Sequence, residues 1–252
     1  LFLETVGFLL ISFILFAGFS LFYAEQGVFG ARKFIYLASV APIYFVVRQI
    51  LGASSGARRA FFVLQVRVGV VVAVLGSLQF LLQFIVSKEL VARGMALLSP
   101  FLYGDNFGAL VVQSASWFVR LGGRDYFRAI SVFPDPHTFA LYLGFVIPPL
   151  FAFLLSKKEK SKTYWLGFMG SLLALLFTFS RGGYLSLLCF LAWFAVFGFY
   201  FLQRSQRLIF ISVVLGCCAA LLLFPFGTRL LQAFDPQERS FTDRAAIMAQ
   251  GV

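Results

Sequence analysis

The sequence predicts an all-α integral membrane protein, a polytopic bundle of about seven transmembrane helices. Of its 252 residues 61% are hydrophobic and 12% are charged, and the mean hydropathy is +0.92. Soluble domains carry about 25% charged residues, so a chain this apolar needs lipid as its solvent. Helices are favoured over a barrel because the apolar runs are continuous and do not alternate with polar residues.

Seven segments have the roughly 17–25 mostly apolar residues of a spanning helix: 6–23, 34–50, 61–86, 137–156, 163–180, 184–203 and 208–226. They divide the chain into three N-terminal spans (1–86), an extracytoplasmic loop (87–136), four further spans (137–226) and the start of a large extracytoplasmic loop (227–252). The chain begins at Leu1 and ends at Val252 within a helix-like pattern, so we expect a fragment.

Basic residues in the short loops predict the orientation. The loop from Lys157 to Lys162 is strongly basic and should be cytoplasmic. Counting spans from it makes the loops with Arg58 and Arg204 cytoplasmic too. The loop with Arg32 falls outside, which is an exception to the rule that basic loops are cytoplasmic. The long loop 87–136, the turn at Ser180 and everything after residue 227 then share the outer face of the cytoplasmic (inner) membrane. Because the basic residues follow this pattern, the net charge of +11 does not indicate nucleic-acid binding.

Within the long loop, Met95–Leu102 and Phe107–Phe118 are apolar enough to lie along the membrane surface as short amphipathic helices. Asp135 is a good N-cap and Pro136 a good first helical residue, so the fourth span should start there. Pro148 and Pro149 should kink that span.

The stretch Ser180-Arg181-Gly182-Gly183 is a polar interruption between two long apolar runs. Arg181 is either a helix-end anchor whose charge reaches the membrane surface or a phosphate contact, because a guanidinium matches phosphate oxygens. The two glycines would let a ligand or a neighbouring helix approach closely.

Three further residues precede or begin the fourth span. Arg124 is either part of a salt bridge within the loop or a substrate contact, and Arg128 is the better candidate for a contact. His137, the single histidine of the chain, is either a surface or capping residue or a group within reach of a substrate hydroxyl. One histidine and scattered acids predict no metal site, and we expect no cofactor.

Other polar residues within the spans have simpler explanations. Cys189, Cys217 and Cys218 lie in apolar runs and should be inert. Gln79 and Gln83 are one helical turn apart, and they either line an outward cleft or join helices by hydrogen bonds.

Three segments resemble the O-antigen ligase and O-antigen polymerase superfamily. The segment from Arg128 to Leu143, with Phe-Pro-Asp-Pro-His-Thr at its centre, resembles the opening of a central span in that family. Phe177–Leu185 is similar to its threonine–x–serine–arginine–glycine turn, and Asp243–Ile247 resembles the arginine-bearing helix at the start of its large periplasmic loop. His137 stands where the family more often has asparagine, a tolerated variation at a helix start.

The resemblance implies a metal-independent inverting glycosyltransferase. It would transfer a glycan from an undecaprenyl-diphosphate donor to a lipid A–core or growing polysaccharide acceptor outside the cytoplasmic membrane, in contact with membrane lipid. Arg128 and Arg244 would be catalytic and hold the diphosphate, while Arg181, Ser180, Arg124 and His137 would bind or support the donor. The catalytic histidine of the family would lie beyond Val252.

Two other functions fit the sequence less well. A transporter, such as a flippase of lipid-linked sugars, should carry charges deep in several spans, whereas the span centres here are almost entirely apolar. An inert membrane scaffold would leave Arg128, Arg181 and Arg244 without a shared purpose.

Overall fold

The computed structural model describes residues 2–23, 27–113, 115–121, 123–155 and 162–222. The predicted span 208–226 is therefore seen up to Leu222, and Arg244 lies outside the described residues. The described chain is mostly helical and falls into two compact units, Leu1–Leu64 and Gln65–Val252.

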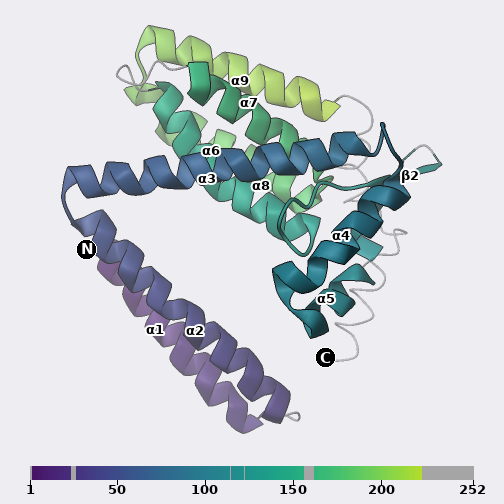
Figure 1. Cartoon of the computed structure of the whole chain (residues 1–252). Helices are drawn as coiled ribbons and strands as arrows, with labels where there is room; N and C mark the ends of the chain where they lie inside the picture. Colours follow the sequence, from purple (N-terminus) through teal and green to yellow (C-terminus); the bar gives the residue numbers. More distant parts are fainter. Residues whose placement is uncertain (1, 24–26, 114, 122, 156–161, 223–252) are drawn as a thin grey trace. The chain divides into compact units, whose positions relative to one another are not determined.

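The first unit is a helical hairpin followed by the start of a third helix (Figure 1). Its elements are α1 (Phe2–Ser20), the short 3₁₀ helix η1 (Leu21–Tyr23), α2 (Gly27–Gly52) and the first part of α3 (Ser55–Leu82). Glycines let α1 and α2 approach closely, since a Cβ at Gly18 would lie 3.2 Å from the Phe34 ring. Most of their large apolar side chains are exposed, as expected of helices that face lipid.

The second unit contains the rest of α3 and every later element. These are α4 (Lys88–Tyr103), α5 (Asp105–Val112), η2 (Ala115–Trp117), β1 (Phe118–Leu121), β2 (Arg124–Phe127), α6 (Pro136–Leu155), α7 (Lys162–Phe177), α8 (Arg181–Phe197), η3 (Phe199–Phe201) and α9 (Arg204–Leu222). α6 is the central helix, packed against α7 and α8, and its Phe139, Leu143, Val146 and Leu150 are completely buried.

α3 packs on α6 through small residues. A Cβ at Gly69 would lie 2.4 Å from Val146, and one at Gly76 would lie 2.5 Å from Phe139. Ala73, between these glycines, is also buried. Such a small-residue stripe is the usual means by which membrane helices approach closely.

A helix coincides with each of the seven predicted spans, but the count of about seven spans is not confirmed. Four helical segments in the described residues are long and apolar enough to cross a membrane: Thr5–Tyr23, Gly30–Gly52, Ser55–Leu82 and Pro136–Leu155. The apolar helices α7 and α8 are shorter, with 16 and 17 residues. Several apolar helices of this kind suggest a membrane protein.

The long loop differs from the purely helical prediction. Met95–Leu102 lies within α4, but the helix expected over Phe107–Phe118 ends at Val112 and is followed by the two-stranded antiparallel sheet β1–β2. Exposed and buried residues alternate along β1, and Gly123 at the turn between the strands has φ +78°, a conformation that favours glycine.

Candidate functional site

The candidate site lies where α6 and α8 begin, side by side in the second unit. The predicted start of α6 is confirmed: the Asp135 carboxylate accepts hydrogen bonds from the backbone N–H of His137 (2.8 Å) and Thr138 (2.9 Å). Burial raises the Asp135 pKa, but the hydrogen bonds from Thr138 and His137 outweigh it and hold the pKa below its usual range. The carboxylate is therefore ionised at neutral pH.

Ser180 caps α8 in the same manner. Its Oγ accepts a hydrogen bond from the Gly183 backbone N–H at 3.3 Å, and its own N–H donates to Thr178 Oγ1 at 3.2 Å. Phe179, between them, has φ +47°, a conformation that costs an aromatic residue about 1–3 kcal/mol. The tight turn from α7 to α8 is therefore maintained by specific contacts.

His137 joins the two helix starts. Its Nδ1 lies 3.1 Å from Ser180 Oγ, so a residue of the first turn of α6 meets the cap of α8. A helix N-terminus carries a partial positive charge that attracts anions, and Asp135 and Ser180 already accept from the first N–H groups of the two helices. Two such termini lie together here.

Two residues of the turn differ in their surroundings. Arg181, the first residue of α8, is partly exposed, and Gly182 is exposed. A Cβ at Gly183 would lie 2.9 Å from Ala140 of α6, whereas one at Gly182 would meet no atom within 4 Å. Gly183 therefore serves helix packing, and Gly182 leaves open space beside Arg181.

Arg128 lies beneath the turn. Its side chain is 2% exposed, and it donates hydrogen bonds from Nε to the Thr178 carbonyl (2.6 Å) and from Nη1 to the Ser116 carbonyl (2.9 Å). The next residue, Ala129, donates its N–H to the Phe177 carbonyl at 2.9 Å. Arg128 thus fastens the segment before α6 to the turn before α8, and direct contact with a diphosphate stays a prediction.

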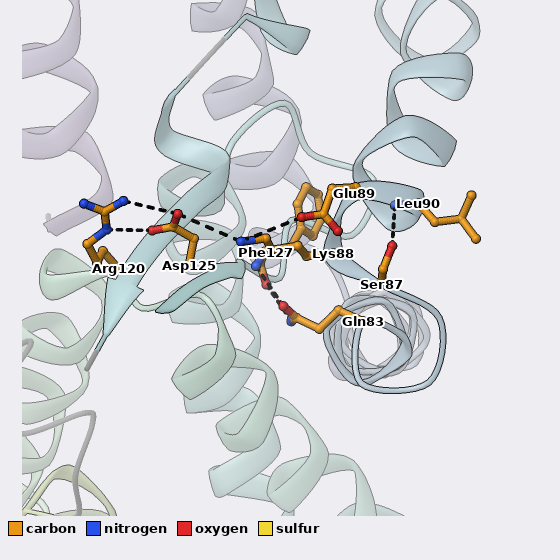
Figure 2. Close-up of polar contacts among 8 residues, drawn as sticks. All are labelled: Gln83, Ser87, Lys88, Glu89, Leu90, Arg120, Asp125 and Phe127. Atoms are coloured by element: carbon orange, nitrogen blue, oxygen red, sulfur yellow. Dashed lines mark hydrogen bonds and ion pairs between the residues drawn. The ribbon is translucent and has the colours of Figure 1, made fainter. Parts of the chain in front are cut away.

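Gln79 and Gln83 form hydrogen bonds with the backbone of the chain from the end of β2 to α6, which also contains Arg128. Gln79 Oε1 accepts hydrogen bonds from the N–H groups of Ile130 (3.0 Å) and Ser131 (2.8 Å). Gln83 pairs with both backbone groups of Phe127, each at 2.9 Å, as Figure 2 shows. The two glutamines attach to the backbone of β2 and of the segment before α6, and not to another helix. They also line hollows: Gln79 lines the groove beside α4, and Gln83 lines the hollow beside Lys88.

Arg124 lies on β2 and is exposed. The salt bridge expected in this loop involves its neighbour: Asp125 pairs with Arg120 at 2.9 Å and with Lys88 at 3.9 Å (Figure 2). The hydrogen bond from Arg120 holds the pKa of Asp125 below its usual range. Arg124 instead lines a polar hollow with Lys88, Gly123 and Tyr126.

The structure thus brings together Arg128, His137, Ser180 and Arg181 from separate parts of the chain, and it places Arg124 four residues away along the hairpin. Arg244 lies outside the described residues. Within the described residues no three His, Cys, Asp or Glu side chains are grouped to hold a metal ion. The arrangement of two helix starts, a partly exposed arginine and a buried arginine suits an anionic ligand.

The chain matches no protein-family model, no curated protein and no solved structure.

Proposed function

We propose that the chain is the donor-binding part of a membrane glycosyltransferase similar to the O-antigen ligases and polymerases. It would transfer a glycan from an undecaprenyl-diphosphate donor to a lipid A–core or polysaccharide acceptor at the outer face of the cytoplasmic membrane. The observation that carries this proposal is the meeting of two helix starts at the His137–Ser180 contact, with Arg181 beside it.

A diphosphate suits this place for electrostatic reasons. The N-termini of α6 and α8 supply partial positive charge, and Arg181 offers a planar set of donors. The ionised Asp135 offsets part of the charge at α6, so the start of α8 is the more attractive end for an anion. The open space at Gly182 gives a phosphate room beside the backbone.

The proposed reaction is a single displacement at the anomeric carbon of the donor sugar. The acceptor hydroxyl oxygen forms the new bond, and its proton passes to a base expected C-terminal of the described residues. The bond from the anomeric carbon to the diphosphate oxygen breaks, and the electron pair leaves with undecaprenyl diphosphate. Positive charge fixed near that oxygen stabilises the transition state.

In this proposal Arg128 contributes its positive charge, and its hydrogen bond to Thr178 fixes the turn between α7 and α8. Its two carbonyl partners fix the guanidinium under the start of α8. A fixed charge needs no reorganisation during the reaction, which is the condition under which electrostatic stabilisation is most effective. Arg181 is the residue placed to contact the diphosphate.

The test uses the full chain in nanodiscs with an undecaprenyl-diphosphate-linked glycan and an acceptor, with and without chelator. Arg181→Ala and Gly182→Val should lower the release of undecaprenyl diphosphate by about 10²-fold or more without lowering the melting temperature. Matched controls are Arg204→Ala, an exposed arginine that is the first residue of α9, and Gly170→Val, a helical glycine with no atom within 4 Å of its Cβ position.

Three results would contradict the proposal. Full turnover in Arg181→Ala and Gly182→Val would remove the start of α8 from the mechanism. Loss of release on chelation would contradict metal-independent chemistry. Movement of the lipid-linked sugar across the bilayer without release of undecaprenyl diphosphate would favour the transporter.

A further inference from the structure

α4 has two different exposed faces. Leu90, Leu97 and Phe101 are 55%, 83% and 88% exposed, and at 3.6 residues per turn they fall within about 40° of one another around the helix. Glu89 and Arg93 form an exposed polar strip whose centre is about 80° away. A helix with adjacent apolar and polar exposed faces is suited to the boundary between lipid and water.

The third face of α4 packs on the protein. Val91 and Ser99 are 7% and 1% exposed, and Ser99 Oγ donates to the Gly108 carbonyl of α5. The helix is also capped: Ser87 accepts a hydrogen bond from the Leu90 N–H at 3.2 Å (Figure 2). α4 is therefore held in place while its apolar face stays uncovered by protein in the described residues.

An apolar groove of about 500 Å³ separates α4 from the end of α3. Leu75 and Leu82 of α3 line one wall, and Leu90, Gly94 and Leu98 of α4 line the other. Leu90 and Leu98 are also exposed, so the groove opens onto the apolar side of α4. α3 is long and apolar enough to cross a membrane, which places this opening beside the acyl chains of the bilayer.

We propose that α4 lies in one leaflet of the membrane and that the groove between α3 and α4 binds an acyl chain of a diacyl phospholipid. The exposed apolar face faces the lipid, and the strip with Glu89 and Arg93 faces the headgroups and water. A phospholipid fits because Arg93, on the exposed polar strip, offers positive charge at the level of the lipid phosphates. The proposal requires α3 to cross a membrane and does not depend on the proposed glycosyl transfer.

Gly94 provides a way to block the groove without damaging the fold. A Cβ at this position would meet no atom within 4 Å, and replacing glycine inside a helix raises helix propensity. Gly94→Leu should therefore fill the groove while keeping or raising the melting temperature. Gly170→Leu, in α7 and away from the groove, has equally open surroundings and is the control.

The experiment places photoreactive p-benzoylphenylalanine at Leu98, at Leu97 or at Glu89 in the full chain, in nanodiscs of phosphatidylethanolamine and phosphatidylglycerol. Mass spectrometry after illumination identifies the adducts. Phospholipid adducts are expected at Leu97 and Leu98 and only weakly at Glu89. Gly94→Leu should lower the yield at Leu98 about tenfold, the effect of excluding two methylene groups, and Gly170→Leu should leave it unchanged.

Three outcomes would overturn the proposal. Equal yields at Leu98 and Glu89 would show that α4 does not separate lipid from water. An unchanged yield at Leu98 in Gly94→Leu would show that the groove holds no acyl chain. Adducts at Leu98 with the mass of a polyprenyl lipid in place of a phospholipid would assign the groove to a different occupant.

Discussion

At the scale of single residues, Arg128 shows how a charged side chain can be built into an apolar protein. Its Nε and Nη1 donate to the carbonyls of Thr178 and Ser116, so backbone dipoles compensate part of the buried charge. Removing the side chain leaves buried carbonyls without donors, which is more costly than the net value of the bonds.

We expect Arg128→Met to destabilise the protein by about 3 kcal/mol, because hydrogen bonds from a charged donor contribute about 1.5–3 kcal/mol each. The exposed neighbour Arg124 provides the control, and Arg124→Met should change stability little. The measurement is the fraction of monodisperse protein after heating in detergent. Equal melting of the two variants would mean that the buried guanidinium does not fasten the turn.

The lowered pKa of Asp135 predicts that the stability of the fold at the start of α6 depends on pH. Because hydrogen bonds hold its pKa below the usual range, the ionised carboxylate stabilises the fold at pH values above the pKa that Asp135 has in the unfolded chain. This contribution is lost as the pH falls through the folded pKa. Asp135→Asn keeps an oxygen that can cap the helix but does not titrate. The melting difference between wild type and Asp135→Asn should shrink from neutral pH to about pH 3, and a difference independent of pH would contradict the assignment.

At the scale of elements, the contact between α3 and α6 depends on glycines. We expect Gly76→Ala to destabilise the second unit by roughly 1–3 kcal/mol, the usual cost of overpacking, because its Cβ would lie 2.5 Å from the Phe139 ring. Gly94→Ala, in the open surroundings of α4, should be neutral or stabilising. Thermal melting of both variants in the same detergent measures the contrast, and similar shifts would indicate that Phe139 moves aside freely.

The helices were predictable because a long apolar run is a local property, and the start of α6 was predictable because Asp135 and Pro136 are adjacent. The β1–β2 hairpin was missed, since its strands have four residues each. The visible signal was the pair Gly122-Gly123, preceded by the mostly apolar run Trp117–Leu121 and followed closely by Tyr126 and Phe127. The burial of Arg128 could not be predicted, because its acceptor at Thr178 lies fifty residues away. The same holds for the His137–Ser180 contact.

At the scale of the whole molecule, the second unit places the β1–β2 hairpin and the starts of α6 and α8 at the same end. α8 leads from this end to η3 and α9 at the other. If the unit crosses the membrane as proposed, the hairpin faces the outside and the connection from α8 to α9 faces the cytoplasm.

Arg124→Cys and Gln203→Cys test this orientation, because both positions are exposed and lie at opposite ends of α8. With Cys189, Cys217 and Cys218 replaced by alanine, an impermeant thiol reagent added to intact cells should label the cysteine at 124 and leave that at 203 unlabelled. Permeabilised cells, in which both should react, provide the control. Labelling at 203 alone would reverse the orientation and remove the outer-face donor site.

The attachment of Arg128 to Thr178 also affects the order of biosynthesis. A ribosome adds about 5–20 residues per second, so the fifty residues between the two take roughly 3–10 s. During that interval α6 is synthesised, while the Thr178 carbonyl that Arg128 needs does not yet exist. The arginine must remain hydrated until α7 arrives. A chain stalled in this interval lacks the Thr178 acceptor, so the segment that carries Arg128 is not yet attached to the turn before α8.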